Sequence, residues 1–189
     1  MVCMNREEII NWLKENLNDE RYEHSLGVAE KSKEIAKNFG LDSDKAEFAG
    51  LIHDCAKCLK KEELIKIINE NLRVEQCEMI NPKTFHAPCG AYLAQKIFGV
   101  EDSEILSAIR WHTIGHHGMT DFEKVIFIAD KIEPRTRPKE MIDSIEPYLA
   151  QGLDKALLAC YKLTIKSLVD RNLKICVNTI DLYNELLND

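Results

Sequence analysis

The sequence has few of the residues that break helices. Only 8 glycines and 5 prolines occur among 189 residues, whereas 45% of the residues are apolar and 30% are charged. This composition is typical of a compact helical protein and excludes a disordered chain. We expect one domain over residues 1–189, because a chain of this length buries roughly two-thirds or more of its unfolded surface in a single core.

Long apolar runs and a secretion signal are also missing. No stretch approaches the ~20 apolar residues that cross a bilayer, and the N-terminus lacks a basic segment followed by an apolar one. The 7 cysteines are odd in number and scattered along the chain, which is typical of reduced thiols. We therefore expect a cytoplasmic protein with no membrane partner.

Clusters of positive charge are absent as well. The net charge is −7, and no run rich in Lys or Arg offsets it. A DNA or RNA polymer would be repelled over most of such a surface, so we expect no nucleic-acid polymer as partner. An anionic small substrate would need cations gathered in one place, from a metal or from a few side chains.

Helical periodicity dominates what is present, and no strand-like alternation of useful length occurs. Asn5 with Glu8 predicts a capping box at the start of the first helix, and Gly40 predicts the end of the second. The fold class that we expect is all-α, a helical bundle around a buried metal site. The predicted helices are Asn5–Leu17, Asp19–Phe39, Ala46–Lys57, Leu59–Asn71, His86–Phe98, Ser103–His112, Thr120–Asp130, Pro138–Ala150, Leu153–Arg171 and Thr179–Leu187.

Polar side chains follow two apolar segments directly. His53 and Asp54 come after Ala49–Ile52, and Asp130 ends the run Val125–Ala129. Burying a carboxylate is costly unless it has a partner. We see no buried Lys or Arg nearby in the sequence, so a metal ion is the partner that we expect.

Three more histidines have similar settings. His24 lies in the buried stripe of the second helix, His86 begins the fifth and His112 ends the sixth. One histidine on an apolar face is more often a hydrogen-bonded core residue, but their joint placement with His53, Asp54 and Asp130 favours a metal site. Imidazole and carboxylate ligands favour Fe, Mn, Co, Ni or Zn over Ca. Six ligands suit two metals that share a carboxylate.

The order of these residues resembles the HD superfamily of metal-dependent phosphohydrolases. The sequences around them resemble, more narrowly, the YqeK-type family, whose members are symmetrical diadenosine tetraphosphatases. The resemblance covers about residues 21–137, and the C-terminal helices would complete the bundle. The matching stretches are His24–Ala29, Ala49–Lys57, His86–Ala91, Ala108–Thr113 and Ala129–Pro134.

The resemblance implies a reaction and a ligand set. A metal-activated hydroxide would attack the polyphosphate bridge and release two ADP. One or two divalent or trivalent transition metals are implied, with iron expected and Mn, Co, Ni or Zn as alternatives. The first metal would be held by His24, His53, Asp54 and Asp130. Asp54 would bridge to a second metal on His86 and His112, which contact phosphate instead if that position is empty.

The resemblance also implies substrate contacts beyond the ligands. Lys57, three residues after Asp54, is near the same helical face; we expect a phosphate or transition-state contact, with a surface lysine as the alternative. The family has one arginine after its Glu-Pro pair, so the register of Arg135 and Arg137 stays open. The substrate-binding set is His24, Asp54, His86, His112, Thr113, Asp130, Arg135, Arg137, Leu173, Lys174, Ile175, Cys176, Val177 and Asn178.

The last of these segments departs from the family. Relatives carry His-Pro where this chain has Cys176-Val177, so a packed linker is the alternative to a nucleotide enclosure. Cys55 and Cys58 have the spacing of a redox motif, but no strand precedes them, and we interpret both as ordinary thiols. His116 and His117 are expected in a loop near the mouth of the site.

Other functions remain open at this point. The rivals are another HD nucleotide phosphohydrolase or nucleotidase, a di-iron oxygenase and a non-catalytic nucleotide sensor. The expected partners are a small dinucleoside polyphosphate or ADP, together with a second copy of the chain in a homodimer.

Overall fold

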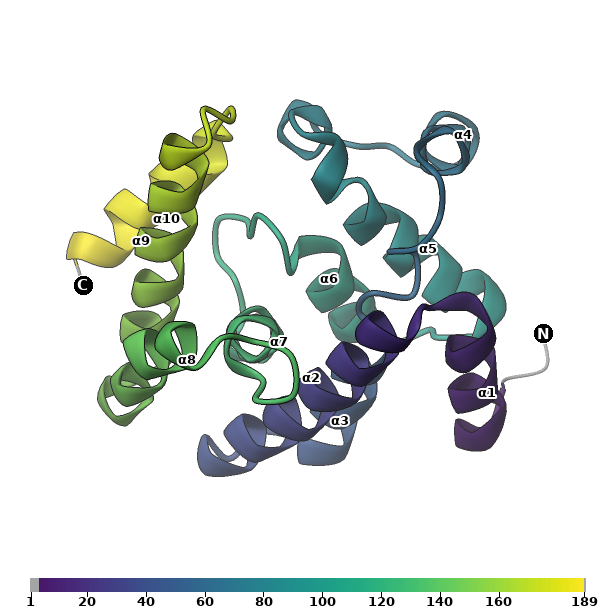
Figure 1. Cartoon of the computed structure of the whole chain (residues 1–189), viewed down its shortest axis with the longest axis horizontal. Coiled ribbons are helices and arrows are strands. Elements are labelled where there is room, and N and C mark those ends of the chain that lie inside the picture. Colours follow the sequence, from purple (N-terminus) through teal and green to yellow (C-terminus); the bar gives the residue numbers. More distant parts are fainter. Residues whose placement is uncertain (1–3, 189) are drawn as a thin grey trace.

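The computed structural model describes residues 4–188, and within this range the regular structure consists of helices alone. The predicted all-α fold class is thereby confirmed (Figure 1). The α-helices are α1 (Arg6–Asn16), α2 (Asp19–Asn38), α3 (Ser43–Ile52), α4 (Lys61–Asn71), α5 (His86–Ile97), α6 (Ser103–Trp111), α7 (Asp121–Ile132), α8 (Lys139–Ile145), α9 (Leu153–Asp170) and α10 (Val177–Asn188). Short 3₁₀ segments are η1 (Gln76–Met79), η2 (Pro82–Thr84) and η3 (Glu146–Gln151).

Helix α3 differs from its prediction at both ends. It begins at Ser43, where the Asp42 side chain accepts hydrogen bonds from the backbone N–H groups of Asp44 and Lys45. It ends at Ile52, because the His53 ring nitrogen Nδ1 donates to the Gly50 carbonyl at 2.7 Å and takes an acceptor that the helix would otherwise use. His53 and Asp54 therefore lie in turns after the helix rather than inside it.

The predicted helix Pro138–Ala150 is also interrupted. Helix α8 ends at Ile145, and the chain continues as η3 with Pro147 in its first turn. Proline has no backbone N–H and cannot extend the preceding helix. The capping box of Asn5 and Glu8 forms as predicted.

Helices α2, α3 and α7 form the centre of the bundle, with α6 packed on α3 and α7, and α9 packed on α7 (Figure 1). Helices α2 and α3 approach very closely at Gly50. A Cβ atom added there would lie 2.9 Å from the Val28 carbonyl oxygen, so only glycine allows this crossing. Apolar side chains such as Ile52, Ile126 and Phe127 are fully buried between the helices.

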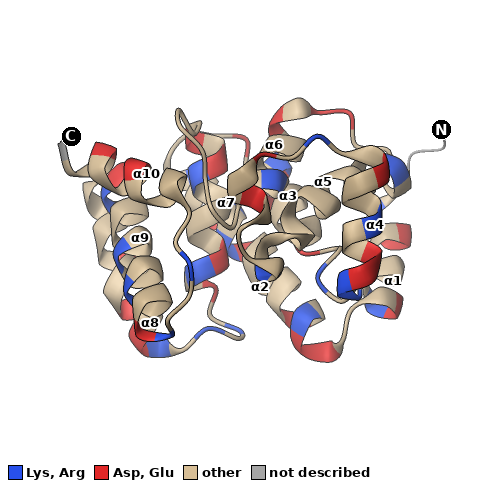
Figure 2. Ribbon diagram, turned by 90° about the horizontal axis from the view of Figure 1, so that it is seen from above, with Lys and Arg blue, Asp and Glu red and all other residues tan. Residues whose placement is uncertain are grey.

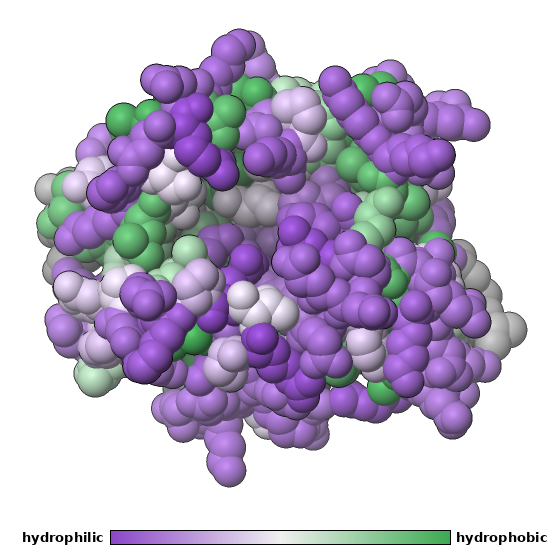
Figure 3. Space-filling view, viewed as in Figure 1, coloured by the Kyte–Doolittle hydropathy of each residue, from purple (hydrophilic) through white to green (hydrophobic). Residues whose placement is uncertain are grey.

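The surface is polar and mixed in charge. Figure 2 shows acidic and basic residues scattered among the other residues of the helices, and hydrophilic residues cover most of the face shown in Figure 3. No helix in the described range combines the length and apolar character needed to cross a bilayer. The described cysteines are free thiols, and Cys3 lies outside the described residues.

Candidate metal centre

Three imidazole rings are held by the turn that carries them. The Nδ1 atoms of His53, His86 and His112 each donate to the carbonyl three residues earlier, at 2.7, 2.8 and 2.7 Å. A ring that donates through Nδ1 carries its free electron pair on Nε2. All three rings are almost completely buried, and their Nε2 atoms point toward Asp54.

His24 reaches the same place from α2 with a different anchor. Its Nδ1 atom lies 3.0 Å from Glu133 Oε1, and its Nε2 atom lies 2.9 Å from Asp130 Oδ1. Glu133 is fully buried just after α7 and also accepts hydrogen bonds from the backbone N–H groups of Arg135 and Thr136. A carboxylate behind an imidazole fixes the ring tautomer and raises its basicity as a ligand.

The two carboxylate oxygens of Asp54 face two different groups of ligand atoms. Oδ2 lies 4.0 Å from His24 Nε2 and 3.7 Å from His53 Nε2, and Asp130 Oδ1 lies on this side at 3.8 Å from His53 Nε2. Oδ1 lies 3.1 Å from His86 Nε2 and 3.4 Å from His112 Nε2. Asp54 is therefore placed as a carboxylate that can bridge two neighbouring metal positions.

These residues fit a divalent transition metal. Ligands about 2.0–2.2 Å from one metal lie roughly 3–4 Å from each other. The candidate ligand atoms of His24, His53 and Asp130, and those of His53, Asp54 and His112, lie within 4.8 Å of one another. Two buried ligand atoms, His53 Nε2 and Asp54 Oδ1, have no well-aligned hydrogen-bond partner among the described residues. An unpartnered buried acceptor is costly, and a cation between these atoms would satisfy both.

The titration behaviour of the cluster agrees with metal binding. Burial by itself raises the pKa of Asp54, but the neighbouring His53, Lys57 and His86 outweigh it and hold this pKa well below the usual range. Burial lowers the pKa of His112 to about 4 and also lowers the pKa of His86. At neutral pH the carboxylate is thus ionised and these two imidazoles are neutral, which are the forms that coordinate a metal.

Four partly exposed cations surround the cluster. Lys57 Nζ lies 3.5 Å from Asp54 Oδ1 and 2.9 Å from His86 Nε2, and Arg21 lies 3.8 Å from Asp54 Oδ2. Lys131 and Arg137 contact the two oxygens of Asp130 at 2.5 and 2.6 Å. The sequence-based expectation was that no buried Lys or Arg lies near the carboxylates; all four of these side chains are partly exposed, yet they lie close to both carboxylates. The position of Lys131, directly after Asp130, is the feature of the sequence that could have predicted a cation beside this carboxylate.

Either Arg135 or Arg137 could match the single arginine that the family has after its Glu-Pro pair. The structure places these two side chains in different surroundings. Arg137 donates to the carbonyl and the carboxylate of Asp130 and lies 3.2 Å from His24 Nε2. Arg135 turns outward and pairs with Glu23 and Glu30 at 2.6 and 2.7 Å. The structure therefore brings Arg137 to the cluster and keeps Arg135 away from it.

Thr113, His116 and His117 lie just after the end of α6 and in the loop that follows it. The Thr113 hydroxyl is buried beside His112 and has no hydrogen-bond partner within the described part of the chain. His116 bonds Glu123 Oε1 at 2.9 Å, so its ring is used to hold the loop to α7. His117 is exposed and pairs with Glu185 at 2.9 Å.

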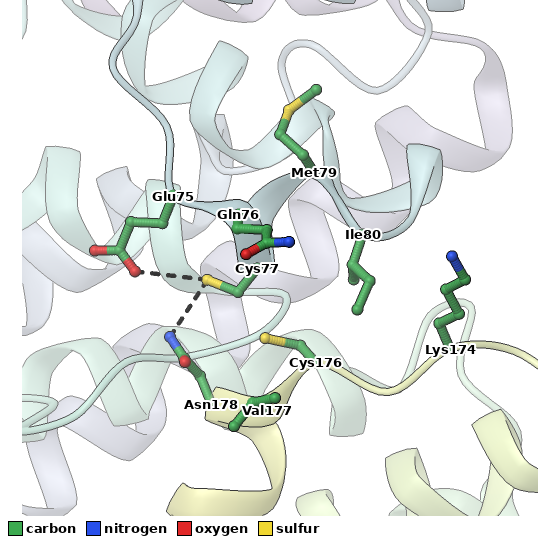
Figure 4. Close-up of a pocket in the computed structure, with 9 residues that line it drawn as sticks. All are labelled: Glu75, Gln76, Cys77, Met79, Ile80, Lys174, Cys176, Val177 and Asn178. Atoms are coloured by element: carbon green, nitrogen blue, oxygen red, sulfur yellow. Dashed lines mark hydrogen bonds between the residues drawn. The ribbon is translucent and has the colours of Figure 1, made fainter.

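Part of the segment 173–178 lines a cavity of about 530 Å³, which we name the first cavity. Figure 4 shows Lys174, Cys176, Val177 and Asn178 facing residues 75–80 across it. Asn178 Nδ2 donates to Cys77 Sγ at 3.3 Å and ties the two walls together. Leu173 and Ile175 do not line this cavity.

Glu133 and Thr136 are site residues that sequence reasoning missed; the Thr136 hydroxyl lies 3.3 Å from His24 Nδ1, beside Glu133. Replacing Glu133 by glutamine should weaken metal binding about 10- to 100-fold, because His24 loses the charged acceptor behind its ring. Competition with a chelator measures this affinity. Glu30→Gln, at an exposed partner of Arg135, is the matched control, and equal affinities in the two variants would refute the role of Glu133.

Known proteins similar to this chain share both its sequence and its fold. The HD domain family model matches residues 21–135. A symmetrical bis(5′-nucleosyl)-tetraphosphatase of Bacillus subtilis is 42% identical over 98% of this chain and 99% of its own length. Its counterpart from Staphylococcus aureus is 35% identical over 96% and 94%. The crystal structure of a predicted HD superfamily hydrolase involved in NAD metabolism from Clostridium acetobutylicum matches with a TM-score of 0.92 and 37% identity, over 99% of each chain.

Proposed function

Because this chain belongs to the HD-domain family of symmetrical bis(5′-nucleosyl)-tetraphosphatases, as its sequence predicts, we propose that it hydrolyses diadenosine tetraphosphate to two ADP. The observation that carries this function is the cluster around Asp54, in which buried imidazoles and carboxylates meet beside four cations. A net-acidic chain can bind a polyanion there, because the positive charge is concentrated at one place.

Iron is the metal that we propose for the first position, where His24, His53, Asp54 and Asp130 would hold it. The second position, on Asp54 with His86 and His112, has fewer protein ligands and is filled less firmly. When bound, the metal lowers the pKa of a water molecule toward about 7 and polarises the phosphoryl oxygens. The support for two positions is that Asp54 directs a different oxygen to each group of ligands.

The side chains around the cluster position the phosphates. Lys57 and Arg137 stand on opposite sides, beside Asp54 and Asp130, and both are about one-quarter exposed, so a bound bridge can reach them. Each donates charged hydrogen bonds to phosphate and offsets the charge that develops in an in-line displacement. The free Thr113 hydroxyl adds a neutral donor beside His112. The first cavity receives one nucleoside.

Product analysis tests this function. The metal-loaded chain should convert diadenosine tetraphosphate to ADP alone, because cleavage occurs at the middle of the bridge. Chromatography of the products, with elemental analysis of the same preparation, measures both the reaction and the metal. Formation of ATP with AMP would contradict symmetrical cleavage. Turnover of mononucleotides alone would indicate a nucleotidase, and oxygen consumption without phosphate chemistry would indicate an oxygenase.

A further inference from the structure

Symmetrical cleavage constrains where the substrate must bind. The broken bond lies at the middle of the tetraphosphate, so two phosphates and one nucleoside lie on each side of that bond. A site built for this reaction therefore needs a nucleoside position on both sides of the metal cluster. The first cavity can supply only one of them. This inference rests on the proposed function.

A separate cavity of about 310 Å³ adjoins the other side of the cluster; we name it the second cavity. It lies between the end of α7, α8 and α9. Its wall includes Lys131 and Arg137, two cationic side chains that contact the carboxylate of Asp130. It is near the lower end of the size range of small-ligand pockets, so it suits one nucleoside rather than a whole dinucleotide.

The charge of the second cavity is opposite to that of the protein. Lys131, Arg137 and Arg171 line it, and no acidic residue does so in the described range, although the chain carries a net charge of −7. Basic residues are visible in Figure 2 along α9 and on the connection from α7 to α8. Arg171 forms no ion pair with any described residue, so its guanidinium is available for an anion.

The rest of the wall suits a nucleoside. Thr164 and Ser167 place hydroxyl groups on α9, and neither side chain has a hydrogen-bond partner among the residues described. Met141 and Leu163 supply apolar surface for a base. A few polar groups on a largely apolar wall are the usual composition of a site for a small organic ligand.

The lining residues of each cavity connect it to one side of Asp54. The first is lined by residues 75–80, on the segment that leads into His86, which faces Asp54 Oδ1. The second borders Asp130, which lies with His24 and His53 on the side of Asp54 Oδ2. Each side of Asp54 is thus connected to one cavity, the first through the segment that leads into His86 and the second through Asp130.

We propose that the second cavity binds the other nucleoside diphosphate half of the substrate. Lys131 and Arg137 hold the phosphates nearest the cluster, and Arg171 with the α9 hydroxyls holds the outer part. Both halves leave as ADP, so the metal-loaded chain has two ADP sites.

Two variants test this assignment, one at an exposed position of α9 and one at the exposed residue that directly follows α9. Ser167→Trp fills the second cavity, and Arg171→Glu reverses the charge at its mouth. The matched controls are Val169→Trp, at a side chain 58% exposed outside the cavity, and Lys166→Glu, at an exposed lysine paired with Asp170. Equilibrium dialysis of ADP against the metal-loaded full chain counts the sites, and steady-state kinetics with diadenosine tetraphosphate gives KM.

Wild type and both controls should bind two ADP per chain, whereas Ser167→Trp should bind one. Loss of a charged contact to phosphate should raise KM about tenfold or more in Arg171→Glu. Circular dichroism identifies a variant that fails to fold. If one of the two variants does not fold, the result of the other variant is used to test the second nucleoside site. Wild-type stoichiometry and KM in the folded variants, with ADP as sole product, would overturn the second nucleoside site alone. ATP with AMP, or no cleavage by wild type, would overturn the proposed function and this site together.

Discussion

Replacing Asp54 by alanine will remove both the bound metal and the hydrolysis of diadenosine tetraphosphate. Its two carboxylate oxygens face all four imidazoles of the cluster. Without them, neither proposed metal position keeps a complete ligand set. We expect a fall in rate of about a thousandfold or more, comparable with removal of a principal group that stabilises charge in a transition state. Elemental analysis and a product assay on one preparation measure both effects.

The helices should survive this change. Asp54 lies in a turn after α3, and its removal relieves a buried charge rather than an apolar contact. Asp143→Ala is the matched control, because Asp143 is an exposed aspartate on α8 paired only with Lys139 among the described residues. Unchanged metal content in Asp54→Ala would show that the ligands are wrongly assigned.

Replacing Arg137 by alanine should lower kcat/KM about 10- to 100-fold. The guanidinium stands beside Asp130 and His24, where it can reach a phosphate of the bound bridge. Hydrogen bonds to charged groups contribute about 1.5–3 kcal/mol, which corresponds to roughly that range of rate. Initial rates at several substrate concentrations measure the loss.

Arg135→Ala is the control offered by the chain itself. Arg135 is occupied by Glu23 and Glu30 on the outer face of α2, so its loss should change kcat/KM by less than about twofold. The two arginines are two residues apart and have the same chemistry. A larger effect of Arg135→Ala than of Arg137→Ala would reverse the assignment that the side-chain positions support.

Much of the candidate centre follows from sequence because its residues interrupt apolar segments. His53, Asp54 and Asp130 each follow a buried run, and such placement is costly without a partner. The direction of each ring could not be predicted, since it depends on a hydrogen bond. For His24 this bond comes from Glu133, which is 109 positions away in the chain.

The predicted end of the third helix was wrong because a side chain competes with the backbone for a hydrogen-bond acceptor. The Gly50 carbonyl accepts from an imidazole instead of continuing α3, and periodicity alone gives no sign of this exchange. The register of Arg135 and Arg137 depends on how the chain turns after α7, where Glu133 accepts backbone N–H bonds from Arg135 and Thr136. Sequence spacing does not determine which of two nearby side chains such a turn directs inward.

The arrangement of the cluster along the chain has a consequence for biosynthesis. Every proposed ligand, from His24 to Asp130, is made before α9 and the segment 173–178, which wall the two cavities. Chains emerge and begin to fold from the N-terminus, and binding of a metal contributes directly to folding free energy. We therefore expect that a nascent chain can bind metal before either nucleotide cavity is complete.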